Sequence, residues 1–520
     1  MRVVLALAVG FAAVAAPAHA AWYQASSRHF LIYSEQKPAT LRQFAEELEK
    51  FDSAVRFVRR MDDLPPSQGN RLTIFVFRHP DLVQKLAKDR SGLIEGFYRG
   101  RMAGSVAYVT LGDSAPSQED AATGSNIARS SDAVRADTTL LHEYAHHLMF
   151  QDVARPYPQW LVEGFAEFMS TAQFEPDGSV GLGLPDKQRY AGLLVGNQLP
   201  LTELIPGKYD KLSEEEFESV YGRGWLLTHY LTFEPSRKGQ LERFVGLLST
   251  GADSLEAARQ AFGDLPKLDH ELDAYLQRSR LQYVKISGAA LKVGAIEVSK
   301  LSAAASDAIP FVAALKNDPD PPAAQALANS LASLEQRDGV DAFDEIALAE
   351  AEFDAKKFDA AEAAADRALA ADPASVQAMV LKGRAKIERL AASKAPAAEF
   401  TETRSWFLKA NNLDPEDPQP LFEFYNSFVK QGISPNVNAI AALHYASDLA
   451  PQDEGVRLMS ASQYLADDKI KEGRAALIAV AYDPHGGEVA GMARQMIDRI
   501  DARDIRGAMK LAGWRFPPGS

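Results

Sequence analysis

The stretch LLHEYAHHLMF, residues 140–150, places three of the chain's ten histidines and one glutamate in an otherwise apolar segment. The residues before it, Asp137, Thr138 and Thr139, are typical of a helix start, so this stretch is expected to be helical. A buried helix gains nothing from imidazole rings, because each ring needs a hydrogen-bond partner once it leaves water. A role other than packing is therefore expected to fix these positions.

Within this stretch, His142, Glu143 and His146 form the pattern H-E-x-x-H. Residues i and i+4 share one face of a helix, so His142 and His146 can reach a single metal ion. Zn²⁺ suits such a site, because it accepts imidazole readily and keeps a position open for a reactive water. Glu143 is placed to take a proton from that water. The alternative, a helix with surface histidines, is disfavoured by the apolar neighbours.

The third histidine, His147, directly follows the second expected ligand. Successive helical residues are separated by about 100° around the axis, so His147 cannot bind the same ion. We expect His147 to make a polar contact or to lie on the surface.

A second helix is expected at 160–172, which overlaps the sequence PQWLVEGFAEFMS. HEYAHH followed by WLVEGFAEF resembles the gluzincin metallopeptidases, whose second helix carries a glutamate ligand in a W-L-x-E-G-F-A type sequence. The resemblance implies that Glu163 is the third ligand of one Zn²⁺ ion, beside His142 and His146. Two histidines and one glutamate leave the fourth tetrahedral position for water. Glu167, one turn further on, either orients a ligand histidine or is a solvated helix charge.

Downstream, SVYGRGWLLTHYL contains a segment similar to the Y-x-[KR]-G of aminopeptidase-like gluzincins, beginning at Tyr221. The resemblance implies that the Tyr221 hydroxyl stabilises the oxyanion that forms on the scissile carbonyl. A packed aromatic ring is the alternative for Tyr221. His229 is a further candidate donor, although a structural role is expected for it.

One departure from this resemblance concerns the choice of substrate. Aminopeptidase-type gluzincins carry a G-x-M-E-N sequence that binds the substrate's free amino terminus, whereas residues 100–104 here read GRMAG, without a glutamate. Endopeptidase action is therefore expected rather than aminopeptidase action. The same resemblance implies that extended substrate pairs with the strand before the zinc helix, which makes 104–111 the expected edge strand.

The first twenty residues have the layout of a secretory signal peptide. Arg2 is followed by a short apolar run and by APAHA, whose small residues favour cleavage after Ala20. An uncleaved anchor is disfavoured because the run is too short to span a bilayer comfortably, and no later segment is expected to span one. The mature chain is expected to be periplasmic or secreted.

Composition restricts the remaining possibilities. The chain has 520 residues, too many for one core, and its net charge of −14 disfavours nucleic acid as a partner. It contains no cysteine, so any metal ligands must be nitrogen or oxygen atoms.

The remaining patterns divide the chain into an α+β part and an all-α part. Strands are expected at 29–33, 72–77 and 104–111, a helix at 40–60, and a surface loop at 114–132. The expected domains are a zincin-like metallopeptidase domain at 21–283, a connector at 284–335 and a helical-repeat domain at 336–510.

Recurring prolines mark the repeats. Pro373, Pro415, Pro451 and Pro484 stand in similar contexts, with spacings of 42, 36 and 33 residues. The block at 349–373 resembles the tetratricopeptide repeat (TPR), a helix pair of about 34 residues, and an insertion is expected near 391–399. An irregular helical bundle is the alternative.

Together these observations predict an exported zinc metallopeptidase that acts on peptide or protein substrates. Because helical repeats often bind peptide segments, a protein partner is also expected at the TPR-like region. The alternative function is that of a binding or assembly protein with an inactive peptidase-like domain.

Overall fold

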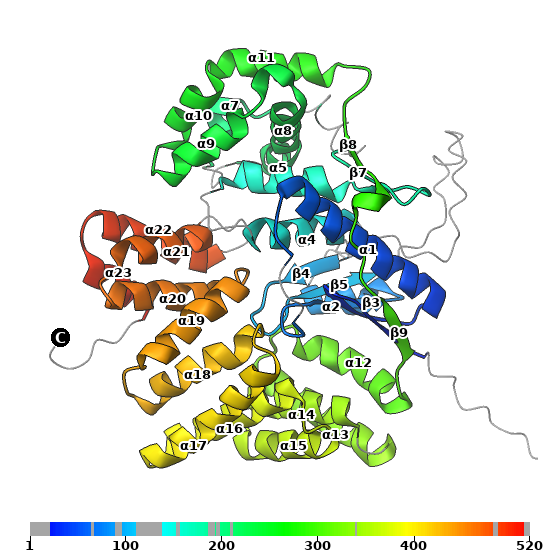
Figure 1. Cartoon of the computed structure of the whole chain (residues 1–520), viewed down its shortest axis with the longest axis vertical. Coiled ribbons are helices and arrows are strands. Elements are labelled where there is room, and N and C mark those ends of the chain that lie inside the picture. The colour runs from blue at the N-terminus through cyan, green and yellow to red at the C-terminus, as the bar shows by residue number, and fades with distance from the viewer. Residues whose placement is uncertain are drawn as a thin grey trace, which may run out of the picture.

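The structure is a computed structural model that describes residues 21–63, 67–88, 96–110, 138–151, 157–185, 193, 198–207, 212–338, 341–481 and 487–513. The expected signal peptide at 1–20 and the loop at 114–132 lie outside the described residues. The chain is a mixed α/β protein, with a sheet near its N-terminus and an all-helical C-terminal region (Figure 1). None of the described helices is long and apolar enough to cross a membrane.

A six-stranded sheet with the order β4-β5-β3-β2-β1-β9 is the centre of the N-terminal part. Strands β2, β3 and β5 run parallel to one another, whereas β4, β1 and β9 are antiparallel to their neighbours. The strands are β1 (Tyr23–Ser26), β2 (Phe30–Ser34), β3 (Leu72–Phe77), β4 (Gly96–Arg99), β5 (Val106–Thr110) and β9 (Glu297–Lys300).

Alternating side chains give this sheet two apolar faces. In β2, Phe30 and Ile32 pack with α1 (Pro38–Arg59) and α4 (Thr138–Gln151), whereas Tyr33 packs on the other face. That second face is covered by α2 (Pro80–Ala87) and α12 (Ala303–Leu315) (Figure 1). A strand that is buried on both faces is apolar throughout, which explains why LTIFVF could be recognised at β3.

The second half of the N-terminal part is a group of helices above α4 in the view of Figure 1. They are α5 (Gln159–Ser170), α7 (Leu201–Leu204), α8 (Glu214–Phe233), α9 (Gln240–Ser249), α10 (Ser254–Phe262) and α11 (Leu265–Leu276). A small sheet of β6 (Gln173–Phe174), β7 (Val180–Leu182) and β8 (Val284–Ile286) lies beside them.

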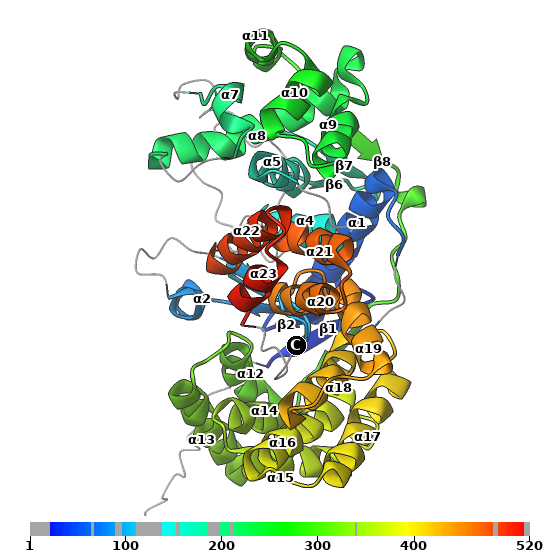
Figure 2. The same ribbon diagram turned by 90° about the vertical axis from the view of Figure 1, so that its left-hand side faces the viewer.

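Helices α12–α23, hereafter the helical region, continue to the last described residues. Beyond α12 they are α13 (Pro321–Asp338), α14 (Ala342–Asp354), α15 (Phe358–Ala371), α16 (Val376–Ser393), α17 (Ala397–Leu413), α18 (Pro418–Gln431), α19 (Val437–Leu449), α20 (Glu454–Ala466), α21 (Ile470–Ala481), α22 (Gly487–Asp501) and α23 (Ile505–Leu511). They curve from below the sheet, and α20–α23 rise along its side to the level of α4 (Figures 1 and 2).

The recurring prolines mark the ends of helix pairs. Pro373, Pro415 and Pro451 each lie two residues after the end of α15, α17 and α19, each the second helix of a pair. Pro484 lies outside the described residues. The extra residues near 391–399 coincide with two longer helices, because α16 and α17 have 18 and 17 residues whereas α14 and α15 have 13 and 14.

The position of β5 and the structure of the segment 284–335 differ from what the sequence led us to expect. The prediction that 104–111 is an edge strand is wrong, because β5 pairs on both sides and β4 lies at the edge of the sheet that the described residues form. The segment 284–335, expected to be a connector, contributes β8 and β9 to the two sheets and also contains α12. The domain boundaries themselves stay a prediction.

Candidate metal centre

Three donor atoms from α4 and α5 meet in a close triangle. The Nε2 atoms of His142 and His146 are 3.1 Å apart, and both face Oε2 of Glu163, at 3.2 Å and 3.4 Å respectively. The His142 side chain is 13% exposed, whereas those of His146 and Glu163 are almost fully buried. His142, His146 and Glu163 are the one group in the described chain that meets the geometric criterion for a metal site.

The size of this triangle fits a tetrahedral ion. Zinc bonds of about 2.0–2.1 Å at tetrahedral angles separate neighbouring donors by ~3.3 Å. The other carboxylate oxygen of Glu163, Oε1, is buried and has no hydrogen-bond partner among the described residues. A cation bound by both carboxylate oxygens would satisfy this atom. Because the same three side chains also form ion pairs with one another, the ion itself stays a proposal.

The two histidines counteract the effect of burial on the pKa of the Glu163 carboxylate. Burial alone would raise the pKa of Glu163, but His146 and His142 outweigh it and hold that pKa well below its usual range. For His142, burial lowers the pKa, and its contacts with Glu163 and the charges of Glu167 and Glu143 reverse this and raise it. Metal binding requires neutral imidazole, so an ion would displace any proton that His142 carries.

Two more glutamates flank the histidines. Glu167, which is buried, has its Oε1 atom 3.6 Å from Nδ1 of His142, on the far side of the ring from the triangle. This position suits a residue that orients a ligand histidine, and it excludes the alternative of a solvated charge. Glu143 is half-buried, and its carboxylate makes no hydrogen bond or ion pair with the part of the chain that the structure describes.

Tyr221 lies beside the triangle because α5 and α8 cross closely. A Cβ atom on Gly164 would be 2.3 Å from the carbonyl oxygen of Gly224, so two glycines are needed at this crossing. The Tyr221 ring, one turn before Gly224, has its centroid 6.3 Å from that of His142. The neighbouring Arg223 bonds Asp269 and Asp273 of α11 at 2.7 Å and 2.8 Å, which anchors α8.

The sequence patterns predicted no role for these glycines or for Arg223. Their signal was present, because a glycine inside a helix marks a close approach or a helix end. Which helix approaches Gly164 could be known only from the structure.

His147 makes the expected polar contact, on a different face of α4 from the triangle. Gln151 Nε2 donates to Nε2 of His147 at 2.9 Å, and the other ring nitrogen, Nδ1, lies 2.9 Å from the hydroxyl of Tyr98 in β4. The Gln151 orientation follows from Arg56, which donates to its Oε1 at 3.0 Å. Burial lowers the pKa of His147 to about 3, so the ring is a neutral link between α4 and β4.

His229 is structural and cannot act as the donor. Its Nε2 atom lies 2.9 Å from the carbonyl oxygen of Gln282, and its Nδ1 lies 2.9 Å from the hydroxyl of Tyr275. A carbonyl only accepts, so Nε2 carries the proton. Burial lowers the pKa of His229 to about 4, which agrees with a neutral ring.

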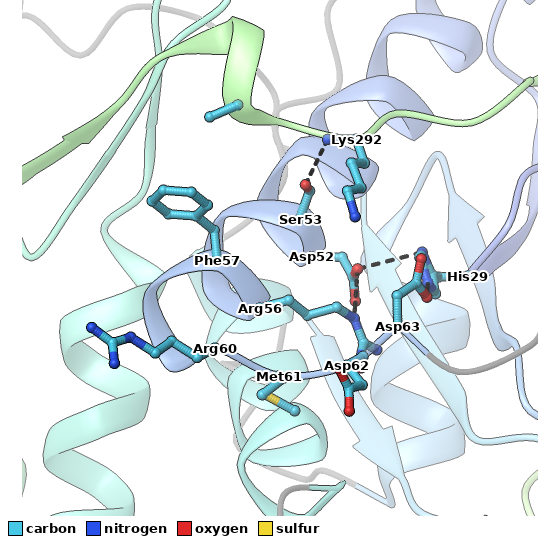
Figure 3. A pocket seen from close by; sticks show the side chains of 11 residues that line it. His29, Asp52, Ser53, Arg56, Phe57, Arg60, Met61, Asp62, Asp63 and Lys292 are labelled. Atoms are coloured by element: carbon cyan, nitrogen blue, oxygen red, sulfur yellow. Dashed lines mark hydrogen bonds and ion pairs between the residues drawn. The ribbon is translucent and has the colours of Figure 1, made fainter.

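A separate polar cluster lies behind α4. A cavity of about 290 Å³ is lined by the end of α1 and the following turn, with His29, Asp52, Arg56 and Asp63 among its residues (Figure 3). None of the triangle residues lines this cavity. Asp52 also accepts a 2.8 Å hydrogen bond from Tyr144 of α4, so the cluster supports the helix that carries the histidines.

Comparison with known proteins adds no assignment, because no protein-family model matches the chain and no curated protein matches it either.

Proposed function

We propose that the chain is a zinc-dependent peptide hydrolase. The observation that carries this proposal is the triangle of His142, His146 and Glu163, whose donors have the spacing of a tetrahedral metal site. A catalytic zinc ion has three protein ligands and one open position, and when bound it polarises a carbonyl and activates water. The group found in the described chain contains three donor residues and no fourth one.

The residues around the triangle have the chemistry that hydrolysis needs. Glu143 follows the first ligand and offers a half-buried carboxylate that is not engaged by the described residues, so it is our candidate proton acceptor. It would later donate this proton to the leaving amine. The Tyr221 ring lies on the His142 side of the site, from which a phenol can donate a hydrogen bond to the developing oxyanion.

The sheet edge beside α4 supports a peptide as the substrate. Within the described residues, β4 pairs with β5 on one side only, so its other edge offers backbone N–H and C=O groups. An exposed edge strand binds extended peptides by adding a strand to the sheet. Residues 100–104, which follow β4, contain no carboxylate to hold a free amino terminus, which supports endopeptidase action.

The finer fold assignment belongs to this proposal. The position of α4 on the sheet, with α5 beside it, supports a zincin-like domain. The helix pairs marked by prolines support TPR-like repeats. The N-terminal sequence supports export to the periplasm or the medium.

The test combines metal content with hydrolysis. The purified mature chain should contain one zinc per molecule, and it should cleave an unfolded protein such as reduced casein. Glu143→Gln should retain zinc and lose activity by roughly 10²–10⁴-fold, the usual share of general acid–base catalysis. Glu242→Gln, an exposed glutamate on α9, is the matched control and should change neither property.

The alternative is a binding or assembly protein with an inactive peptidase-like domain. The same experiment separates the two functions. Stoichiometric zinc without turnover in the wild type would favour the binding protein, whereas a chain that retains no zinc would contradict the metal site itself.

A further inference from the structure

The turn that joins β4 to β5, residues 100–105, is held by the helical region. The backbone N–H of Met102 donates to Oδ2 of Asp453 at 2.9 Å, and Gln452 Nε2 donates to the carbonyl oxygen of Arg101 at 3.1 Å. A Cβ atom on Gly100 would lie 2.7 Å from the carbonyl oxygen of Gln452, so backbone meets backbone here.

The side chains of the turn are held as well. Met102 packs against an apolar cluster of α18–α20 that includes Tyr425 and Leu443. Arg101 donates to the carbonyl oxygen of Lys316 at 3.1 Å, and its guanidinium lies 3.7 Å from the buried Glu350. The turn therefore contacts both the beginning and the later helices of the helical region, which are far apart in sequence.

The two carboxylate oxygens of Asp453 accept hydrogen bonds from different parts of the chain. Oδ1 accepts a hydrogen bond from Val456 N at 2.9 Å and caps the first turn of α20. Oδ2 accepts the hydrogen bond from Met102 N. Because the carboxylate has acceptors on both sides, it joins a helix end to the β4–β5 turn without an additional side chain.

The same turn is connected to the helix that carries the histidines. Ser105 Oγ accepts a 2.9 Å hydrogen bond from the hydroxyl of Tyr98 in β4. That hydroxyl also lies 2.9 Å from Nδ1 of His147, the residue after His146. A continuous set of contacts thus runs from α20 through the turn and β4 to α4.

We propose that Asp453 is a positioning residue, through which the helical region fixes edge strand β4 beside the metal centre. The short strand β4 has a strand partner on one side only among the described residues, so its other edge is not held in register by a strand. In this proposal the helical region binds the β4–β5 turn of the same chain. The proposal rests on the proposed function in so far as β4 is the strand that receives peptide substrate.

Asp453→Asn tests this with little change in shape. The Asn Oδ1 can still cap α20, since asparagine is a good N-cap residue, but its amide N–H₂ cannot accept from Met102 N. Asp253→Asn is the matched control, because Asp253 caps α10 with Oδ1 alone and lies far from the turn. Circular dichroism and zinc content should be unchanged in both variants.

Two measurements on the folded full-length chain decide the question. In Asp453→Asn, amide hydrogen exchange in β4 and the turn should become roughly tenfold faster, as loss of one hydrogen bond to a charged group predicts. With an extended peptide substrate, KM should rise about 5–10-fold while kcat stays within about twofold, because the metal ligands do not move. The Asp253→Asn control should change neither.

The exchange measurement does not depend on hydrolysis, so the two proposals can fail separately. Unchanged exchange in Asp453→Asn would overturn the positioning role even if the wild type is an active peptidase. A fall in kcat with unchanged KM would also overturn it, because Asp453 would then act on the metal site. If Asp453→Asn exchanges faster and the wild type shows no hydrolysis, the positioning role is supported and the proposed hydrolase is contradicted.

Discussion

Gly164 of α5 and Gly224 of α8 meet where the two helices cross, and neither has room for a side chain. A Cβ atom on Gly164 would lie 2.3 Å from the carbonyl oxygen of Gly224, and one on Gly224 would lie 2.5 Å from that of Trp160. This crossing brings Glu163 and Tyr221, each close in sequence to one of the glycines, to the same site. The two glycines are therefore part of the geometry of the candidate site.

Gly164→Ala should accordingly destabilise the fold by about 1–3 kcal/mol, because the added methyl group forces the helices apart. Gly246→Ala is the matched control, since it lies inside α9 with open space around its Cβ position. That substitution should stabilise the fold by about 0.5–1 kcal/mol through helix propensity. Urea unfolding curves measure both effects, and equal effects of the same sign would contradict the close crossing.

Tyr221→Phe should retain zinc and lower kcat by roughly 10²–10³-fold, because it removes one donor to the oxyanion. Tyr230→Phe on the same helix removes a hydroxyl that bonds Glu271, outside the site, and should leave kcat unchanged. Steady-state kinetics with one peptide substrate compare the two variants. Full activity of Tyr221→Phe would leave its ring with a packing role only.

Glu163→Gln should weaken zinc binding by at least ~10–100-fold, because an amide oxygen carries no charge to offset the dication. In the wild type, removal of zinc by EDTA should lower Tm, since the ion binds the folded state alone. The Tm of Glu163→Gln should respond little to EDTA. Glu242→Gln on the surface of α9 should behave like the wild type. A wild-type Tm that does not change with EDTA would contradict a metal bound at this triangle.

Local patterns were enough for the two histidines of the triangle and for strands β2, β3 and β5, whereas Glu163 was implied only by the resemblance. The spacing of His142 and His146 is a property of any α-helix, and β3, apolar except for Thr73, is recognisable because it is buried on both faces. Strand order was not accessible in this way. β4 (GFYR) and β9 (EVSK) are short and mixed in polarity, and β9 pairs with β1 from a distant part of the chain.

The wrong prediction of the edge strand also arose because pairing between strands is not visible in a local pattern. β5 satisfies every local criterion of a strand, but whether β4 pairs with it depends on contacts between different segments. The contact between the β4–β5 turn and Asp453 joins residues 351 positions apart and leaves no periodic signal in the sequence. Contacts of this kind explain why the sequence pointed to the three donor residues of the triangle but not to the surroundings that position them.

His29 joins β2 to α1 through a cluster that gives stability a defined pH dependence. Burial alone lowers the pKa of His29, but its hydrogen bond with Glu49 and the charges of Asp52 and Glu49 outweigh it and raise that pKa. Burial raises the pKa of Glu49, but its contacts with His29 reverse this and lower it. The His29 contribution is complete below about pH 6.5 and is lost as pH rises through its raised pKa. The Glu49 contribution is complete above about pH 4.5 and is lost in acid.

His29→Asn should therefore destabilise the chain most between about pH 4.5 and 6.5, by on the order of 1 kcal/mol, and less at pH 8–9. Urea unfolding at several pH values measures the difference. His270→Asn is the control, because His270 is exposed and bonds only the backbone of its own helix among the described residues. A difference that grows toward pH 9 would contradict a charged His29.

Asp417 lies at the contact between the helical region and the loop before β3. It caps α18 by accepting from Gln419 N at 2.9 Å, and a Cβ atom on Gly69 would meet its carboxyl group at 2.5 Å. Burial raises the pKa of Asp417 to about 7, and the charge of nearby Asp414 adds to this effect, although the capping hydrogen bond opposes it. The folded chain thus keeps a proton that the unfolded chain releases above about pH 4, so stability should fall as pH rises from there to 7.

Asp417→Asn should remove this loss, because asparagine retains the cap and cannot ionise. The variant should be more stable than the wild type at pH 8 by about 1 kcal/mol or more, and the gain should disappear near pH 4. Asp253→Asn, an exposed cap on α10, should show no such gain. Urea unfolding at pH 4, 6 and 8 measures the trend. A gain that is the same at all three values would mean that the buried carboxyl group does not take up a proton on folding.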